Sequence, residues 1–269
     1  MRNRIRLLLM PCLFGAVAAR AQSVSQLHTG YSMYARGLEV AELEAGFGLG
    51  PWNYQMQLTY HTTGLVGLLF RGHQLTTVQG AWQGDRPAPL RFWGDGVWRG
   101  ESRQTLIDSN HGQPVIRSLV PPNDAEREPV PAQLQANTVD TLSALALLIR
   151  KVQDTGRCET EARTFDGRRL AVISARTVGD ETLEPTSRSI FNGRALRCDF
   201  EGRQLAGFMR GIDRDELQRP QHGSAWLAQV VPGSPPVPVQ ISFDTRWFGP
   251  ATMYLAKAGA GMPPPPIGD

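Results

Sequence analysis

The sequence predicts a mainly β protein: a large curved antiparallel sheet or barrel-like fold, with one amphipathic helix covering one face. Three observations carry this prediction. Apolar and polar residues alternate with a period of two along most of the chain, which is typical of strands with one buried face. Turn-forming dipeptides such as Asp166-Gly167 separate several of these stretches. Helical spacing of apolar residues occurs in one segment, about residues 138–155.

The first 21 residues have the pattern of a signal peptide, in which a basic head, an apolar stretch and a small-x-small cleavage site follow one another. We therefore predict export to the periplasm with cleavage after Ala21, a single β-rich domain over 22–257 and a disordered Pro-rich tail over 258–269. No apolar run in the chain reaches the roughly 18 to 20 residues that span a bilayer, so the mature chain is expected to lack a transmembrane segment. The three parts of the signal are Arg2, Arg4 and Arg6, then Leu7–Ala19, then Ala19-Arg20-Ala21.

The charge of the mature chain argues against nucleic acid as a partner. The whole sequence has 28 basic and 25 acidic residues, for a net charge of +3. Removing the signal, with its four arginines and no acidic residue, leaves 24 basic against 25 acidic residues, a net charge of −1. A general basic footprint is therefore excluded.

The clearest strand of the N-terminal half is Asn53–His61. Its apolar residues Tyr54, Met56, Leu58 and Tyr60 point to one side, and we take them as a candidate apolar ligand face. Asp95-Gly96 is expected to be a tight turn, and the proline-rich, charged segment Pro121–Gln135 a loop. The other strands expected here are Tyr31–Ala35, Leu38–Leu49, Gly72–Gln83, Pro89–Trp93, Val97–Ile107 and Val115–Leu119.

The single predicted helix covers about Thr138–Thr155. Asn137 or Thr138 is expected to cap its N-terminus, Asp140 to lie in the positive first turn, and Gly156 to end it. Its predicted packing face against the sheet consists of Leu142, Leu145, Ile149 and Val152.

The C-terminal half returns to strands. Asp166-Gly167 and Asn192-Gly193 are the strongest hairpin signals, and Glu201-Gly202 is a weaker one. The strands they imply are Glu159–Phe165, Arg168–Val178, Ser187–Phe191, Arg194–Phe200 and Arg203–Met209, followed by Ala225–Val230, Val237–Trp247 and Thr252–Ala256.

The mature chain keeps two cysteines, Cys158 and Cys198, and in an oxidising compartment two cysteines pair most often. A simple meander would place them three strand spacings apart, about 14 Å, whereas a disulfide needs α-carbons within about 7 Å. Two arrangements satisfy this demand. Cys158 lies in the loop just after Gly156 and reaches across one end of the sheet, or the sheet curls so that the two strands meet.

Motifs that carry chemistry are missing from the sequence. Gly46-Phe47-Gly48-Leu49-Gly50 leads into a strand through Pro51, so it does not form a dinucleotide loop. No GxSxG or HExxH motif occurs, and the five histidines have no ligand spacing. We therefore assign no catalytic, cofactor-binding or metal-binding residue and expect no cofactor.

Several local motifs follow one another in an order that resembles a known family. These are Tyr31, Tyr34 and Gly37 at a strand start, the helix start Val139–Leu145, and then Phe165–Arg169, Phe191–Cys198 and Leu205–Phe208. Over Tyr31–Ala256 the chain is similar to the exported bacterial proteins of the domain of unknown function 3108 family. Members usually have proline after the helix-start aspartate, where this chain has Thr141. The resemblance implies a periplasmic β-rich fold and transfers no catalytic residue.

The function expected from these observations is that of a non-catalytic envelope protein that binds a lipid, another apolar ligand or an envelope partner. A structural or scaffold protein of the periplasm is the alternative, followed by an enzyme that acts on envelope glycan or lipid. A cavity in the curved sheet, and the polarity of its lining, would discriminate among these three classes.

Overall fold

The computed structural model describes residues 25–69, 71–245 and 249–262, so the predicted signal peptide and the end of the predicted tail lie outside the described residues. The described chain is mainly β, as the sequence predicts. Its strands are β1 (Ser25–Ala35), β2 (Leu38–Leu49), β3 (Asn53–Thr62), β4 (Gly72–Gln83), β5 (Arg86–Trp98), β6 (Glu101–Asn110), β7 (Gln113–Val120), β8 (Thr160–Phe165), β9 (Leu170–Leu183), β10 (Gly193–Ala206), β11 (Gln221–Ala228), β12 (Val237–Thr245) and β13 (Gly249–Ala260).

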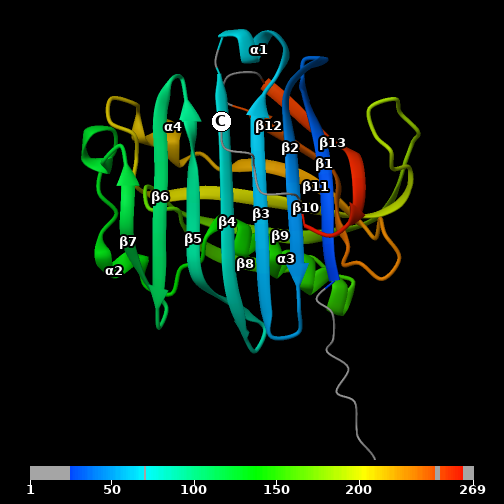
Figure 1. The fold of residues 1–269 in the computed structure, drawn as a ribbon, viewed down its shortest axis with the longest axis horizontal. Helices are drawn as coiled ribbons and strands as arrows, with labels where there is room; N and C mark the ends of the chain where they lie inside the picture. The colour runs from blue at the N-terminus through cyan, green and yellow to red at the C-terminus, as the bar shows by residue number, and fades with distance from the viewer. Residues whose placement is uncertain (1–24, 70, 246–248, 263–269) are drawn as a thin grey trace, which may run out of the picture.

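All thirteen described strands belong to one antiparallel sheet with the order β7-β6-β5-β4-β3-β2-β1-β13-β12-β11-β10-β9-β8. Every neighbour in this order is also a neighbour in sequence except β1 and β13, which pair from Leu27↔Ala260 to Ala35↔Ala251. In Figure 1 the strands β1–β7 run along the page while β8–β11 cross behind them, so the sheet bends back over itself. The predicted curved, barrel-like sheet is thus present, with β7 and β8 as its two end strands.

The long helix is α3 (Thr141–Thr155), which begins three residues later than predicted. Asp140 is the N-cap rather than a first-turn residue, because its side chain accepts a hydrogen bond from the Ser143 backbone N–H at 2.9 Å. Gly156 ends the helix in the left-handed region at φ 66°, as expected. The structure also contains short helices that the sequence analysis did not predict. They are α1 (Gly64–Leu69), α2 (Ala132–Gln135), α4 (Arg214–Gln218) and a 3₁₀ turn, η1 (Asn123–Ala125).

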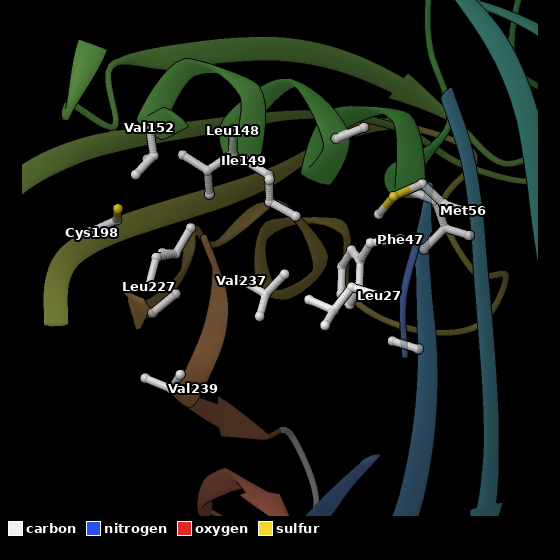
Figure 2. Packing of buried hydrophobic residues seen from close by; sticks show 14 of the residues in the cluster. Leu27, Phe47, Met56, Leu148, Ile149, Val152, Cys198, Leu227, Val237 and Val239 are labelled. Carbon is white, nitrogen blue, oxygen red and sulfur yellow. The ribbon is translucent and has the colours of Figure 1, made fainter. Parts of the chain in front are cut away.

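Helix α3 fills the hollow of the bent sheet. Its side chains Leu148, Ile149 and Val152 lie over residues of strands from both halves of the sheet (Figure 2). Of the predicted packing face, Leu142, Ile149 and Val152 are buried, while Leu145 is only partly buried against the same cluster. The opposing residues include Leu27, Phe47, Met56, Leu227, Val237 and Val239.

Several predicted turns are continuous strand. Asp95-Gly96 lies inside β5, and the turn comes at Arg99-Gly100, where both residues have positive φ. Glu201-Gly202 lies inside β10, and Asn192-Gly193 ends a long loop, so the expected strand Ser187–Phe191 is absent from the described loop. The Asp166-Gly167 hairpin between β8 and β9 is confirmed.

The C-terminal strand is longer than predicted. β13 continues through Ala260 because Leu27 and His28 of β1 pair with Ala260 and Gly259. The disordered tail was expected to begin earlier, at residue 258. No helix in the described part of the chain is long and apolar enough to cross a membrane.

Cys158 and Cys198 form the predicted disulfide, with α-carbons 5.8 Å apart. Cys158 lies in the loop between α3 and β8, and its backbone N–H donates to Thr177 Oγ1 of β9 at 2.8 Å. Thr177 pairs with Cys198 in the adjacent ladder. The first of the two expected arrangements is therefore correct: Cys158 passes over β9 to reach β10, the third strand of the meander rather than the fourth.

The two end strands are joined by side chains and loops. Arg168, in the β8–β9 turn, donates through Nη2 to the backbone oxygens of Val120 and Pro121 at 2.7 and 2.9 Å. A second apolar cluster joins Ile107 of β6 to Phe165 and Leu170 of β8 and β9. Among the described strands, β7 and β8 share no ladder. We call this junction the seam.

Candidate functional site

The predicted apolar ligand face of β3 extends from the core to a cleft. Tyr54 and Met56 are buried under α3, so they are core residues, and as ligand contacts their prediction was wrong. The prediction failed because α3 packs on this part of the β3 face, where the sequence analysis expected a ligand. Leu58 is partly buried against the same core. Tyr60, at the far end of the strand, is partly buried and lines a cleft beside the seam.

This cleft has a volume of about 820 Å³, within the range of small-molecule sites. Strands β3–β6 supply one wall, and the other comes from the loop after β7, the β8–β9 turn and the loop after β10. We call it the arginine cleft. Its lining residues are Tyr60, Gln74, Phe92, Trp98, Arg99, Glu101, Arg103, Thr105, Glu126, Arg127, Asp166, Arg168, Arg169, Met209 and Arg210.

The lining carries six arginines and three carboxylates, a surplus of three positive charges. Guanidinium groups stay protonated at any physiological pH, so titration does not remove this surplus. Charges of one sign that line a concave surface concentrate the electrostatic potential there and attract ions of the opposite sign. The arrangement therefore favours an anion.

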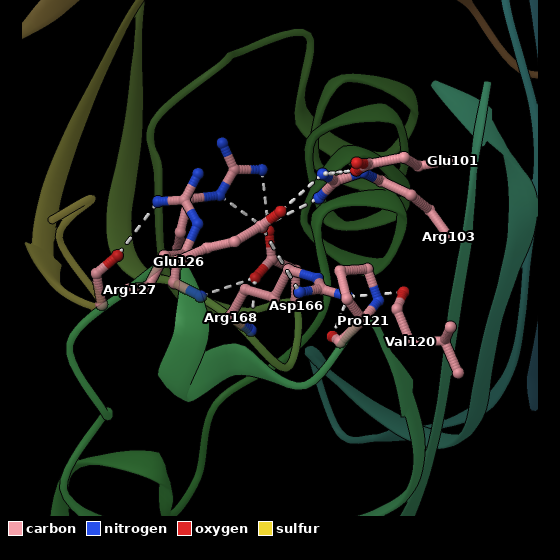
Figure 3. A network of polar contacts seen from close by, with 10 residues as sticks. Glu101, Arg103, Val120, Pro121, Glu126, Arg127, Asp166 and Arg168 are labelled. Carbon is pink, nitrogen blue, oxygen red and sulfur yellow. Dashed lines mark hydrogen bonds and ion pairs between the residues drawn. The ribbon is translucent and has the colours of Figure 1, made fainter. Parts of the chain in front are cut away.

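Two of the carboxylates are already held by arginines. Glu126 accepts from Arg103 through both oxygens, at 2.7 and 3.0 Å, a bidentate pair that lowers the pKa of the Glu126 carboxyl (Figure 3). Asp166 accepts from Nε and Nη2 of Arg169 at 2.9 and 2.8 Å. These pairs fix the walls of the cleft and leave other arginines without a carboxylate of their own.

Arg127 and Arg168 are these arginines. Arg127 donates from Nη1 to the Gly207 carbonyl at 3.1 Å, and Arg168 donates to the two carbonyls across the seam. Within the part of the chain that the structure describes, Arg127 Nε and Arg168 Nη1 are buried and have no hydrogen-bond acceptor. Arg168 Nη1 lies 3.9 Å from Glu126 Oε2, beyond hydrogen-bond distance.

The pKa of both groups shows the strain of this arrangement. Burial lowers the pKa of the Arg127 guanidinium, and the neighbouring charge of Arg169 lowers it further. Burial also lowers the pKa of Arg168, with a further contribution from Arg103. A partly buried guanidinium with an unsatisfied donor is costly, and an incoming anion would relieve that cost.

Aromatic side chains form the remaining part of the cleft. Tyr60 lies on β3, and Phe92 and Trp98 lie on β5; all three line the same cleft as the arginines. Burial raises the pKa of the Tyr60 hydroxyl, so this residue stays neutral and adds no negative charge. The cleft thus offers cationic donors and apolar surface to the same ligand.

A second hollow, of about 770 Å³, lies over β9–β12, and both of its arginines are paired with carboxylates. Arg197 donates to Glu181 at 2.8 Å and to Asp199 at 3.1 Å, and Arg176 donates to Asp199 at 3.0 Å. Paired groups on an exposed sheet face are typical of a structural ion network. For this reason we place the candidate site in the arginine cleft.

Metal chemistry has no support in the described ranges, where no three His, Cys, Asp or Glu residues gather closely enough to hold an ion. The cleft arginines were missed by the sequence analysis, which took Glu126 and Arg127 as part of a charged loop. Their partners are distant in sequence, since Arg103 and Arg168 lie on separate strands and turns. No local spacing links them.

Comparisons with known proteins agree with the fold. The model of the family described as "Protein of unknown function (DUF3108)" matches residues 30–256. A solved structure with a similar fold is described as a beta-barrel-like protein of domain of unknown function DUF1849 from Brucella abortus. It is 12% identical in sequence, with a TM-score of 0.54, and the match covers 88% of this chain and 98% of that one. A search of curated proteins finds no match.

Proposed function

The chain belongs to the DUF3108 family, and from the arginine cleft we propose that it is a non-catalytic module that binds an amphiphile, with the anionic group of that ligand on Arg127 and Arg168. The ligand class is a carboxylate or phosphate joined to an apolar chain. We further propose that the protein works in the periplasm after cleavage at Ala21.

The unsatisfied guanidinium donors of Arg127 and Arg168 are the observation that supports this function. Guanidinium groups match carboxylate and phosphate oxygens in a planar, two-donor geometry. The unused donors Arg127 Nε and Arg168 Nη1 are the atoms that such an anion would satisfy after a small side-chain shift.

The apolar part of the ligand is assigned to Tyr60, Phe92 and Trp98. These residues continue the inner face of the sheet away from the α3 core, so a chain lying on them stays next to apolar surface. The apolar ligand face that the sequence predicts on β3 is thereby reduced to its open end, Leu58 and Tyr60.

The test is calorimetric titration with laurate and dodecyl phosphate below their micelle concentrations, with methyl laurate as a neutral analogue. We expect Arg127→Gln to weaken the binding of both anions at least tenfold and to leave methyl laurate unchanged, since each charged hydrogen bond contributes about 1.5–3 kcal/mol. Arg91→Gln is the matched control, because Arg91 is exposed and pairs with Asp108 away from the cleft.

Three outcomes would overturn the proposal: no binding of either anion, equal affinity for laurate and methyl laurate, or equal loss in Arg91→Gln. Arg127→Lys keeps the charge and separates electrostatic attraction from the two-donor geometry. Retention of at least part of the affinity in Arg127→Lys, together with its loss in Arg127→Gln, is the expected pattern.

A further inference from the structure

Helix α1 presents leucines to solvent at one end of the sheet. It connects β3 to β4 and lies beyond the ends of both strands, at the top of Figure 1. Leu65 is 65% exposed and Leu68 is 75% exposed, whereas Val66 packs against the small cluster of Ala35, Val40 and Ala251. One side of α1 is thus attached to the fold, and the other offers apolar surface.

The neighbouring β1–β2 turn extends this surface. The Thr63 backbone N–H donates to the Val40 carbonyl at 3.1 Å, which fixes the start of α1 against β2. Gly64 has φ 56°, and a Cβ there would lie 2.8 Å from the Glu39 carbonyl oxygen, so this close approach requires glycine. Leu38, next to Glu39, is 58% exposed. We define Leu38, Leu65 and Leu68 as the leucine patch.

Basic residues flank the leucine patch. Arg36 precedes it in the β1–β2 turn, Arg71 follows α1, and Arg99 lies beside Arg71, whose carbonyl accepts from the Arg99 backbone N–H at 3.1 Å. All three arginines are exposed. Exposed leucines flanked by arginines are the pattern of surfaces that enter the headgroup region of an anionic bilayer.

The charges also argue against a second copy of the chain as the occupant. A two-fold interface would place the patch against itself and bring Arg36, Arg71 and Arg99 towards the same three residues of the other copy. The patch is a protrusion rather than a groove, so two copies would have little complementary shape. A bilayer interface accepts both the apolar protrusion and the positive charge.

We propose that the leucine patch docks the protein on an anionic lipid surface. This inference goes beyond the proposed ligand binding and does not depend on it. Arg99 belongs both to the flanking charges and to the lining of the arginine cleft, so docking places the mouth of the cleft next to the headgroups. The partner is a membrane that contains phosphatidylglycerol or a lipid of the same charge.

The experiment is flotation of the protein, purified from the periplasm, with vesicles of phosphatidylglycerol and phosphatidylcholine. We expect the double variant Leu65→Ser, Leu68→Ser to lose at least tenfold in partitioning. The matched control is Leu90→Ser, Val178→Ser, which removes two exposed apolar side chains, at 57% and 48%, that lie on β5 and β9. The control is expected to partition within twofold of the native protein.

Failure of the native protein to float, or equal flotation of the Leu65/Leu68 variant, would overturn the proposal. A native dimer in sedimentation that the Leu65/Leu68 variant dissociates would also overturn it, because the patch would then be a self-interface. Laurate titration separates this inference from the proposed function: the Leu65/Leu68 variant should bind laurate normally, and Arg127→Gln should float normally. Circular dichroism confirms that each variant is folded.

Discussion

The hydroxyl of Tyr54 lies 2.7 Å from Ser143 Oγ, which joins the start of β3 to the first turn of α3. Ser143 Oγ in turn donates to Asp140 Oδ2 at 2.5 Å, while the Ser143 backbone N–H donates to Asp140 Oδ1. All three side chains are buried, and a buried polar group is tolerated only when it is hydrogen-bonded. The chain of bonds therefore fixes both the position and the start of the helix.

Ser143→Ala is expected to destabilise the protein by about 1–3 kcal/mol, because it leaves the Tyr54 hydroxyl and one Asp140 oxygen without this partner. Tyr54→Phe should cost less, about 1 kcal/mol, since it removes the hydroxyl rather than leaving it unsatisfied. The double variant should lose less stability than the sum of the losses of the two single variants, because the two side chains share one hydrogen bond. Urea unfolding of the four proteins measures the coupling, and strict additivity would contradict it.

Ile149→Ala should reduce the free energy of unfolding by about 2–5 kcal/mol, because Ile149 is completely buried between α3 and the sheet and its truncation leaves a cavity. Leu145→Ala, on the same helix but partly exposed, should cost less than half as much. Chemical denaturation checks the order. A larger loss for Leu145→Ala would mean that α3 packs in a different rotation.

Removing the disulfide with Cys158→Ser, Cys198→Ser should cost about 4 kcal/mol, the chain-entropy value for the 40-residue separation of the two cysteines. The comparison is the native protein under oxidising and reducing conditions, which should differ by the same amount, whereas the double-serine variant should not respond. Thiol titration of the unfolded, unreduced mature protein should find no free thiol. Two free thiols would refute the bond.

Acid should weaken the protein through Glu126. The bidentate bond from Arg103 holds the folded pKa of the Glu126 carboxyl below its ordinary value of 4.5. The pair therefore contributes stability above the unfolded pKa, and this contribution is lost as the pH falls through the folded pKa. The thermal midpoint should fall more steeply below about pH 4.5 in the native protein than in Glu126→Gln. Glu184→Gln, an exposed loop variant, should keep the native slope.

Strand positions were predictable where alternation and turn chemistry agreed. The ends of β2 and β4 match the expected ranges because glycines next to the strand ends, at Gly37, Gly50 and Gly84, mark the turns. The prediction of a turn at Asp95-Gly96 was wrong because Gly96 lies inside β5, where it allows a close approach of the paired strand. A Cβ at Gly96 would collide with the His73 carbonyl oxygen of the paired strand, so glycine is there for a close strand approach. A single sequence does not separate the two uses of glycine.

The candidate site was less predictable than the fold. Alternation identified the inner face of β3, but whether that face meets a ligand or a helix depends on where α3 docks, which is a long-range property. The arginine cleft joins Tyr60, Arg103 and Arg168 from three distant parts of the chain. Each of these residues is unremarkable in its local sequence, and their shared surplus of charge exists only after the sheet has bent.

At the seam, two kinds of oxygen compete for the Arg168 guanidinium: backbone carbonyl oxygens and the oxygens of a bound anion. Its guanidinium holds the Val120 and Pro121 carbonyls of one sheet end, and the same group faces the cleft where an anion would bind. Contact between the two sheet ends and binding of an anion would therefore use the same side chain. The two equilibria would then be thermodynamically linked through Arg168. Moving β7 away from the β8–β9 turn breaks bonds from a guanidinium rather than a strand ladder. Such a movement also separates Ile107 of β6 from Phe165 and Leu170, which pack against it across the seam.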